Sequence, residues 1–368
     1  MSIVFVAGTT AEIIKIAPVM RELRERGVPT YLWSTDQHVS GVQETLVNLQ
    51  LAQPDRHLVP ERRRKHIAAS RQVPGWLASV AGGVLRQRSA LLNDLRAKGT
   101  KPVVVVHGDT FTTVLGSLIG RLLRATVAHV EAGLRSGSML SPFPEEANRR
   151  VVGRLATMHF APTQREVENL RREHAPGEVV LTGANTVVDA LRLAAREEPD
   201  DLDLPAEFGL VTLHRFELLR QGEHFSALLR LLARRATETP LVMVVGEAER
   251  ARIAELGLDG LFGDRFRMVP KRSYARFLPV LARAAFVVTD SGGLQEECAV
   301  LGTPCAVHRE RTERHQGLGE NVMLTRFDLD EVAGFLDRWR EYRRPSTLDD
   351  YHPSKIIVDH LERAVRSN

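Results

Sequence analysis

Short apolar runs alternate with amphipathic segments along almost the whole chain. Near-continuous apolar runs, such as the valines at 103–106, are typical of strands covered on both faces, whereas apolar residues spaced by three and four indicate helices. This alternation predicts parallel sheets with right-handed crossovers. The expected strands lie at 2–8, 29–37, 102–109, 126–133, 210–215, 240–246, 265–270, 285–293 and 304–310. The expected helices lie at 11–27, 42–49, 75–99, 112–125, 225–236, 274–284, 294–302 and 355–365.

A polar stretch at 196–209 interrupts the alternation, which restarts after it and therefore indicates an interdomain linker. The sequence predicts two doubly wound, Rossmann-like α/β domains, at 1–195 and 206–345. Such a pair is expected to bind its ligand in the cleft between the domains, at the carboxyl ends of the strands. The tail, 346–368, contains an amphipathic helix, and its return to the N-terminal domain is one possible arrangement.

The composition is that of an ordinary globular protein, with 43% hydrophobic and 26% charged residues. No window approaches the roughly 18 consecutive apolar residues of a membrane span. The first residues enter a strand directly, without the regions of a signal peptide, so a cytoplasmic protein is expected. Cys298 and Cys305, the two cysteines, fit a reducing compartment. The basic run at 61–66 is interpreted as a solvated face, and no nucleic-acid partner is expected.

Polar residues follow the first predicted strand, where a glycine turn leads into a helix. Gly8 and Thr9 follow the apolar residues of the strand, and Glu12 and Lys15 lie in the first turns of the helix. Free N–H groups at a helix N-terminus bind anions, so this turn is a candidate anion site. The alternative is a purely structural N-cap at Thr9 or Thr10.

Carboxylates follow two further strands of the N-terminal half. Asp109 comes after the valine run, where it either caps the next helix or faces a ligand. Glu131 ends the following strand, and Glu145 precedes Arg149 by four residues, a spacing that allows an ion pair on a helix. A carboxylate near a core is costly unless it is paired or used. These groups therefore either neutralise nearby arginines or supply the acid and base for proton abstraction from carbon.

The C-terminal half repeats this arrangement. Ser291, Gly292 and Gly293 lie between a valine-rich strand and a helix expected to begin at Leu294. Two glycines allow a phosphate to approach the backbone, and the helix N-terminus offers its N–H donors. His214 ends another strand and is expected to face the same cleft. The sequence therefore predicts a phosphate site in this half.

Eight collinear segments resemble one known family. They are "GTTAEIIKIAPV", "VHGDTFTT", "VAHVEAGLRS", "SPFPEEANRR", "TGANTVVDAL", "TLHRFE", "TDSGGLQEE" and "LGTPCAVHRERTER". Together they are similar to the UDP-N-acetylglucosamine 2-epimerase family, closest to its bacterial non-hydrolysing type, from about Val4 to about Glu313. The resemblance implies a glycosyltransferase-B fold, a UDP-sugar substrate, a homodimer, and neither a metal ion nor another cofactor.

The resemblance also implies a mechanism. A base removes the proton from C2 of the sugar while UDP leaves C1, which gives 2-acetamidoglucal. UDP then adds back and C2 is protonated from the opposite face, which yields UDP-N-acetylmannosamine. On the matching positions, Asp109, Glu131 and Glu145 are the acid and base candidates. Arg149 would orient the carboxylates, and His214 would stabilise the charge on the departing diphosphate.

Further roles follow from the same resemblance. The phosphates would be held by Lys15 and the Ser291–Gly293 backbone, the ribose by Glu297, and the diphosphate also by Arg314. Part of a second, activating site for UDP-N-acetylglucosamine matches Gln37, His38, Arg71 and Gln72. The chain departs from the family at Thr10, where an arginine is expected on the phosphates, and at Phe216 and Leu218, which occupy polar positions.

Three alternatives remain at this level. A hydrolysing 2-epimerase would release free N-acetylmannosamine and UDP. A nucleotide-sugar-binding protein without catalysis would explain Thr10, although the intact acidic residues argue against it. A metal could also be ligated by a set of four residues at two adjacent strand ends, His107, Asp109, His129 and Glu131.

Overall fold

The computed structural model describes residues 3–39, 41–67, 70–95, 101–137, 143–194 and 203–366. The chain forms two compact units. The N-terminal unit comprises Met1–Leu193 and Tyr351–Asn368, and the C-terminal unit comprises Ala194–Asp350. The first half of the polar stretch expected to link the two domains, residues 196–202, lies outside the described residues.

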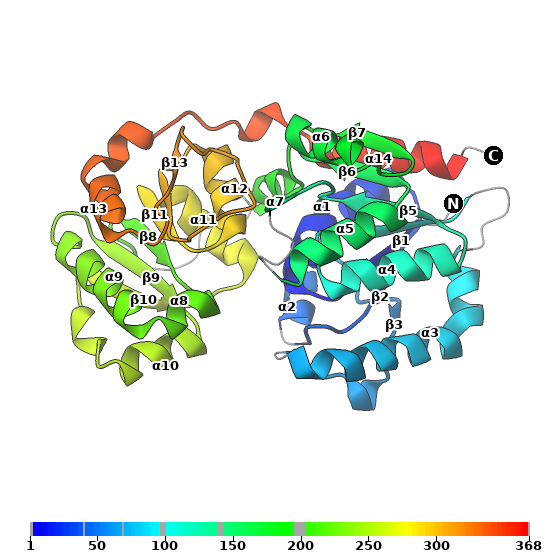
Figure 1. The fold of residues 1–368 in the computed structure, drawn as a ribbon, viewed down its shortest axis with the longest axis horizontal. Coiled ribbons are helices and arrows are strands. Elements are labelled where there is room, and N and C mark those ends of the chain that lie inside the picture. The colour runs from blue at the N-terminus through cyan, green and yellow to red at the C-terminus, as the bar shows by residue number, and fades with distance from the viewer. Residues whose placement is uncertain are drawn as a thin grey trace. The chain divides into compact units, whose positions relative to one another are not determined.

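The N-terminal unit is built on a seven-stranded sheet with the order β3-β2-β1-β4-β5-β6-β7 (Figure 1). All its strand pairs are parallel. The strands are β1 (Ile3–Ala7), β2 (Thr30–Ser34), β3 (Arg56–His57), β4 (Val103–His107), β5 (Thr126–Val130), β6 (Met158–Ala161) and β7 (Glu178–Leu181). The helices are α1 (Thr10–Glu25), α2 (Val42–Asn48), α3 (Val73–Leu95), α4 (Phe111–Leu122), α5 (Glu145–Leu155), α6 (Gln164–Arg172), α7 (Val187–Ala194) and α14 (Pro353–Arg366).

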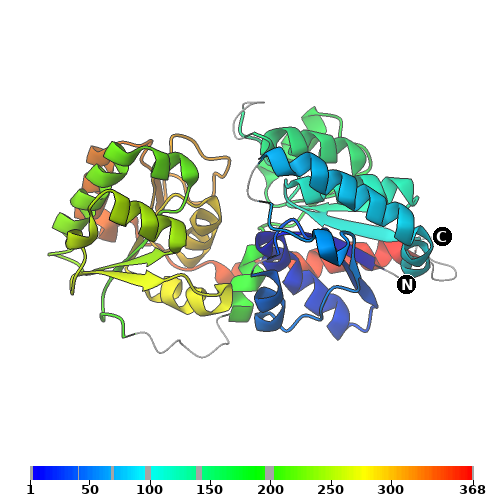
Figure 2. The ribbon, with the colours of Figure 1, turned by 90° about the horizontal axis from the view of Figure 1, so that it is seen from below.

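Helices cover both faces of this sheet, as the valine run predicts. Val103 and Val105 of β4 belong to a core cluster with residues of α1, α2 and α14. Val104 and Val106, which point to the opposite face, pack in a second cluster with residues of α3, α4 and α5. Figure 2 shows α1 and α14 on one side of the sheet and α3 and α4 on the other. Each residue of β4 is therefore buried, whichever face it points to.

The last helix, α14, completes the N-terminal unit. Its apolar face carries Ile357, Val358, Leu361 and Val365, which are fully buried in the cluster shared with α1. Arg26, the residue after α1, forms an ion pair with Asp359 of α14. The tail of the chain thus belongs to the core formed by its first residues.

The C-terminal unit contains a six-stranded parallel sheet with the order β10-β9-β8-β11-β12-β13. The strands are β8 (Gly209–Thr212), β9 (Leu241–Val245), β10 (Phe266–Pro270), β11 (Phe286–Thr289), β12 (Cys305–Val307) and β13 (Val322–Leu324). The helices are α8 (Phe216–Arg220), α9 (Gly222–Arg235), α10 (Glu247–Glu255), α11 (Tyr274–Arg283), α12 (Gly292–Leu301) and α13 (Leu329–Arg338). This is the Rossmann strand order, so the prediction of two doubly wound α/β domains is confirmed.

Within the described ranges, no helix combines the length and the apolar character needed to cross a membrane. The 23-residue α3 is amphipathic, with Val80 and Leu91 buried and Arg86 and Arg88 exposed.

Two adjacent glycines of α3 provide a stability test. A Cβ atom on Gly83 would lie 1.7 Å from the carbonyl oxygen of Leu58, whereas a Cβ on Gly82 would meet nothing within 4 Å. We expect Gly83→Ala to lower the free energy of unfolding by about 2–3 kcal/mol, because α3 must move away from the backbone of Leu58 to make room for the methyl group. Gly82→Ala should raise it by up to about 1 kcal/mol through helix propensity. Urea denaturation of both variants checks this, and equal effects would contradict the close approach.

Candidate active site

In the turn between β1 and α1, the carboxylate of Glu12 binds the backbone N–H groups. Thr9, not Thr10, is the N-cap of α1, and its hydroxyl accepts from the backbone N–H of Glu12 at 3.3 Å. The Glu12 carboxylate in turn accepts from the N–H groups of Gly8 (2.8 Å) and Thr9 (2.9 Å) and from the Thr110 hydroxyl (2.6 Å). Burial raises the pKa of Glu12. These donors, expected to be available to an anion, are therefore occupied by the protein itself.

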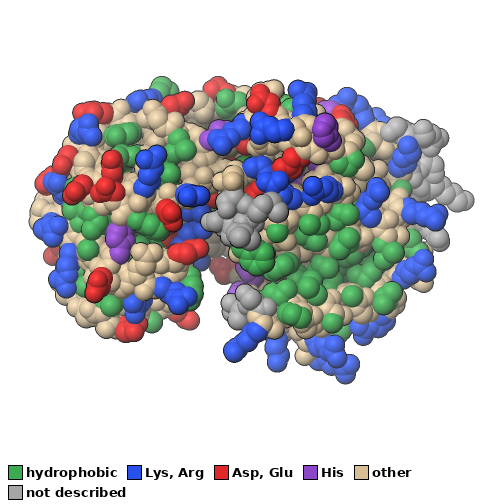
Figure 3. Space-filling model, in the orientation of Figure 1, with side chains coloured by type: hydrophobic (Ala, Val, Ile, Leu, Met, Phe, Trp, Pro, Cys, Tyr) green, Lys and Arg blue, Asp and Glu red, His purple; other side chains and the backbone are tan. Residues whose placement is uncertain are grey.

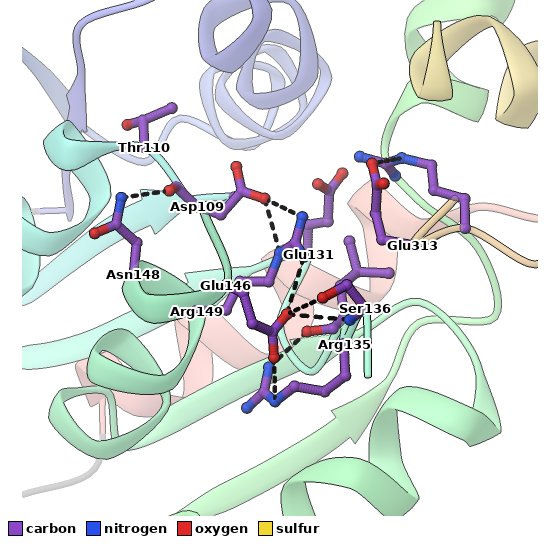
Figure 4. A network of polar contacts seen from close by, with 12 residues as sticks. Asp109, Thr110, Glu131, Arg135, Ser136, Glu146, Asn148, Arg149 and Glu313 are labelled. Atoms are coloured by element: carbon purple, nitrogen blue, oxygen red, sulfur yellow. Dashed lines mark hydrogen bonds and ion pairs between the residues drawn. The ribbon is translucent and has the colours of Figure 1, made fainter. Parts of the chain in front are cut away.

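Asp109 follows β4 and binds an arginine. Its expected alternative role as the cap of α4 is wrong, because Thr110 is the N-cap and forms a capping box with Thr113. The carboxylate Oδ2 of Asp109 accepts from Nε of Arg149 at 2.8 Å and lies 2.6 Å from its Nη2. The side-chain amide of Asn148 donates to the backbone carbonyl of Asp109 at 2.8 Å (Figure 4). Two neighbouring residues of α5 thus hold Asp109 by its backbone and by its side chain.

Glu131 follows β5 in a left-handed backbone conformation, with φ of 65°. This conformation costs about 1–2 kcal/mol for a residue with a side chain, and such strain clusters at functional sites. The buried carboxylate accepts hydrogen bonds from Lys15 and Asn185 and lies 3.7 Å from Nε2 of His107. Lys15, expected on the phosphates, thus contacts a catalytic candidate here. Asn185 lies in the segment "TGANTVVDAL", but sequence reasoning gave it no role.

The two glutamates at the start of α5 differ in burial and in their partners. Glu145 is partly buried, whereas the Glu146 side chain is completely buried. Arg149, expected to pair with Glu145, has contacts with Asp109 and with Glu146, whose Oε2 lies 3.1 Å from Nη1. Arg150 lies 3.3 Å from the same glutamate. Helical spacing allows either glutamate to meet an arginine, so the sequence offered no signal that would select Glu146.

His129 is a buried histidine of β5, the strand that Glu131 follows. Its Nε2 donates to the carbonyl of Gly108 at 2.7 Å, and burial lowers its pKa to about 3. The imidazole is therefore neutral at ordinary pH.

This pKa predicts an acid-sensitive fold. The unfolded chain binds a proton at His129 below about pH 6.5, whereas the folded chain does so only near pH 3. Stability is thus lost as pH falls through this window, by about 1.4 kcal/mol per pH unit for this group. We expect the free energy of unfolding of His129→Gln to fall less steeply between pH 6 and 4.5 than that of the unchanged protein. Urea titrations at each pH measure the two slopes, and identical slopes would contradict the shifted pKa.

The residues matched to the activating site have structural contacts. Gln37 accepts from the N–H and hydroxyl of Thr112 at 3.2 and 2.9 Å. The His38 ring stacks on His66 at a centroid distance of 4.6 Å, and burial lowers the pKa of His38. The other two predicted residues lie exposed in the single-turn 3₁₀ helix Ser70–Gln72.

In the C-terminal unit, the Ser-Gly-Gly segment begins a helix. Helix α12 starts at Gly292, two residues before the expected Leu294. Ser291 is its N-cap and accepts from the N–H of Leu294 at 3.4 Å. Both glycines are therefore helical rather than part of a loop, and they lie in the first turn, where the N–H groups have no helical partners.

Two buried arginines converge on this helix start. A Cβ on Gly292 would lie 3.3 Å from Nε of Arg314 and 3.4 Å from Nη1 of Arg309. Glu313 lies 3.3 Å from Arg309 and 3.8 Å from Arg314, and Arg314 also pairs with Glu296. Burial lowers the pKa of Arg309, a residue that sequence reasoning missed. Guanidinium groups and the free N–H groups of a helix N-terminus are donors suited to phosphate, and here Glu313 and Glu296 hold the two guanidinium groups beside the helix start.

His214 and Glu297 lie in the same unit, each with a defined partner. The half-exposed His214 ring has Nδ1 at 3.2 Å from Asp290, whose carboxylate also accepts from the backbone N–H groups of His214 and Arg215. Glu297 accepts from the hydroxyl of Tyr274 at 2.7 Å. Asp290 follows β11, so it connects the ends of β8 and β11 at the reversal of strand order.

Across the part of the chain that the structure describes, no three His, Cys, Asp or Glu side chains form a group that could hold a metal ion. His129, one of the four proposed ligands, directs Nε2 to a backbone carbonyl. The geometry therefore gives the metal alternative no support.

Two all-parallel units, one with carboxylates at its strand ends and the other with an arginine-lined helix start, define a two-domain α/β protein of the glycosyltransferase-B type. The UDP-N-acetylglucosamine 2-epimerase family profile matches residues 21–343. The chain belongs to this family.

Curated relatives and solved structures agree with this assignment. A UDP-N-acetylglucosamine 2-epimerase of Bacillus subtilis is 34% identical over 325 residues, covering 86% of this chain and 81% of the relative. The enzyme of that name from Yersinia pestis is 33% identical over 344 residues, covering 88% and 86%. The UDP-GlcNAc 2-epimerase of Neisseria meningitidis, solved bound to UDP-GlcNAc, superposes with a TM-score of 0.79 at 27% identity, covering 99% of this chain and 100% of that one. The enzyme of Methanocaldococcus jannaschii, in complex with UDP-GlcNAc and UDP, gives 0.74 at 25% identity, with coverage of 99% and 100%.

Proposed function

We propose that this protein interconverts UDP-N-acetylglucosamine and UDP-N-acetylmannosamine. The observation that carries the proposal is the pair of carboxylates at the ends of adjacent strands, Asp109 held by Arg149 and Glu131 held by Lys15 and Asn185. Inversion at carbon needs one group to remove the C2 proton and another to return a proton to the opposite face. The names of the relatives, and the UDP-GlcNAc bound to the Neisseria enzyme, support the same substrate.

We assign the proton transfers to residues of the N-terminal unit and the stabilisation of the diphosphate to residues of the C-terminal unit. In the N-terminal unit, a carboxylate takes the C2 proton while the C1–oxygen bond breaks and its electron pair leaves with UDP. The resulting 2-acetamidoglucal has a C1–C2 double bond, to which UDP adds back while C2 is protonated from the other face. Asp109, Glu131 and Glu145 are the acid and base candidates. In the C-terminal unit, the start of α12, Arg314 and His214 would stabilise the diphosphate charge.

This chemistry needs no redox cofactor, because protons are transferred but no electrons are gained or lost. We also place the enzyme in the non-hydrolysing branch, in which UDP returns to the glycal before water does. Proton NMR in D₂O with UDP-N-acetylglucosamine tests both statements. Loss of the C2 proton signal with growth of UDP-N-acetylmannosamine is the expected result. Free N-acetylmannosamine plus UDP would identify the hydrolysing branch, and an unchanged spectrum with UDP still binding would refute the activity.

We further propose that the enzyme is a homodimer that pairs through an apolar surface of the N-terminal unit. Figure 3 shows hydrophobic side chains gathered over α3, α4 and α5. The surface includes Leu85, Leu118, Leu122 and Val151, which are 70%, 47%, 64% and 43% exposed. Contiguous exposed apolar surface of this kind typically marks a protein interface.

We expect Leu122→Glu to convert the dimer into a monomer, because the charge would be buried without a partner at the interface. The control is Val47→Glu on α2, where an equally exposed valine (63%) lies outside this surface. Light scattering after size exclusion measures the mass of each variant. A Leu122→Glu variant that stays dimeric would exclude this surface.

A further inference from the structure

The carboxylate of Glu146 lies at the centre of the polar network beside Asp109 (Figure 4). Its side chain is 0% exposed. It accepts from the backbone N–H of Ser136 at 3.1 Å and faces three guanidinium groups, those of Arg135, Arg149 and Arg150, at 4.0, 3.1 and 3.3 Å. Burial of a carboxylate is tolerated only with such compensation. Glu146 is therefore a buried carboxylate with defined partners beside the candidate site, and not a solvated surface charge.

Arg149 connects this carboxylate to Asp109. Its Nη1 donates to Glu146 Oε2 at 3.1 Å, while Nε donates to Asp109 Oδ2 at 2.8 Å. The guanidinium is planar and rigid, so fixing one nitrogen fixes the direction of the others. The position of the Asp109 carboxylate therefore depends on the contact between Arg149 and Glu146.

Glu146 also holds the chain that follows Glu131. Both the backbone N–H and the hydroxyl of Ser136 donate to its Oε2, at 3.1 and 3.3 Å. The strained Glu131 lies five residues before Ser136 in the same connection after β5. One buried carboxylate thus contacts both structural elements that position the acid and base candidates.

We infer that Glu146 is a positioning residue, which orients Arg149 and through it Asp109, and which fixes the loop carrying Glu131. The inference rests on the proposed function, since it assigns Glu146 a part in that reaction without contact to the substrate. It differs from a purely structural role in one respect. Its effect on turnover must pass through Arg149, so the two residues must be energetically coupled.

The primary test is Glu146→Gln, with Glu173→Gln as the matched control. Glu173 binds two of the same arginines, Arg135 at 2.6 Å and Arg150 at 3.2 Å, and has no contact with Arg149 among the ion pairs that the structure shows. We expect kcat of Glu146→Gln to fall about 10²-fold, because a misplaced catalytic group loses that much. KM and the dissociation constant of UDP should stay within about twofold, and Glu173→Gln should keep its kcat within about twofold.

A double variant separates positioning from stability. In the Arg149→Met background, Glu146→Gln should cause no further loss of kcat, because residues acting as a unit are not additive. Additive losses, or a single variant with the turnover of the unchanged protein, would overturn the inference. If Glu146→Gln does not fold, Glu146→Asp tests the same inference. The aspartate keeps the negative charge, but its shorter side chain moves the carboxylate away from Arg149. Unchanged turnover in that variant would refute the role.

Failure of the proposed function is distinguishable from failure of this inference. A protein that does not convert UDP-N-acetylglucosamine refutes the function whatever the variants do. A crystal structure of Glu146→Gln then tests the positioning directly. A guanidinium of Arg149 turned away from Asp109 supports the inference, and one that stays in place overturns it.

Discussion

Asp109→Asn should reduce kcat for UDP-N-acetylglucosamine by about 10³-fold, within the range for removal of a general acid or base. The amide cannot take or return a proton, and it replaces the carboxylate that binds Nε and Nη2 of Arg149. The carboxylate side chain is 22% exposed, so it is accessible to a substrate while held by the arginine. The UDP dissociation constant should change by no more than about twofold, because UDP is assigned to the C-terminal unit.

The rate at which UDP-N-acetylmannosamine is formed gives kcat, and calorimetry with UDP gives its dissociation constant. Asp359→Asn is the control, since it removes the carboxylate of a surface ion pair with Arg26 in the same unit. Near-normal turnover by Asp109→Asn would exclude Asp109 as acid or base. A loss of UDP binding equal to the loss of rate would instead assign it to binding.

Glu131→Gln is expected to have an effect of similar size, about 10²–10³-fold in kcat. The substitution removes the charge that Lys15 and Asn185 hold, and Lys15 is left with a neutral partner at a buried position. If Asp109 and Glu131 act on opposite faces of C2, each variant should lose proton abstraction from one of the two epimers and keep it for the other.

Deuterium incorporation at C2 distinguishes the two faces. Each variant is incubated in D₂O with UDP-N-acetylglucosamine and, separately, with UDP-N-acetylmannosamine. The variant that lacks the base for one epimer should show no exchange with it, yet still eliminate UDP from the other. Equal residual exchange of both epimers in both variants would contradict the two-face assignment. Asp359→Asn is again the control, because it removes a carboxylate of a surface ion pair with Arg26 in the same unit.

The fold could be predicted because it depends on repeating, local signals. The four consecutive valines at 103–106 indicate a strand covered on both faces, and their side chains are all buried. Gly27 ends the first predicted helix, and its φ of 70° is the left-handed conformation that glycine favours. The sequence predicts the start of α12 two residues late, because two consecutive glycines are typical of a loop, whereas here Ser291 caps a helix that begins with them.

The contacts of the site could not be predicted in the same way. Arg149 and Asp109 are 40 positions apart, and Lys15 and Glu131 are 116 positions apart, so no helical or strand spacing relates them. Asp109 and Thr110 are both good N-cap residues, and only the backbone decides that Thr110 takes the role. That choice leaves the Asp109 carboxylate available to Arg149. Sequence identified the chemical groups, and the fold determined their partners.

The packing of α14 against α1 has a consequence for how this protein is made. The ribosome adds Ile357, Leu361 and Val365 after the C-terminal unit, yet these side chains fill the core begun by the first strand. All residues of the C-terminal unit are contiguous and emerge earlier. Domains fold as units during synthesis, usually the N-terminal one first. Here the order is reversed, because the nascent N-terminal unit must wait, with part of its core exposed, until α14 has been synthesised after the whole C-terminal unit.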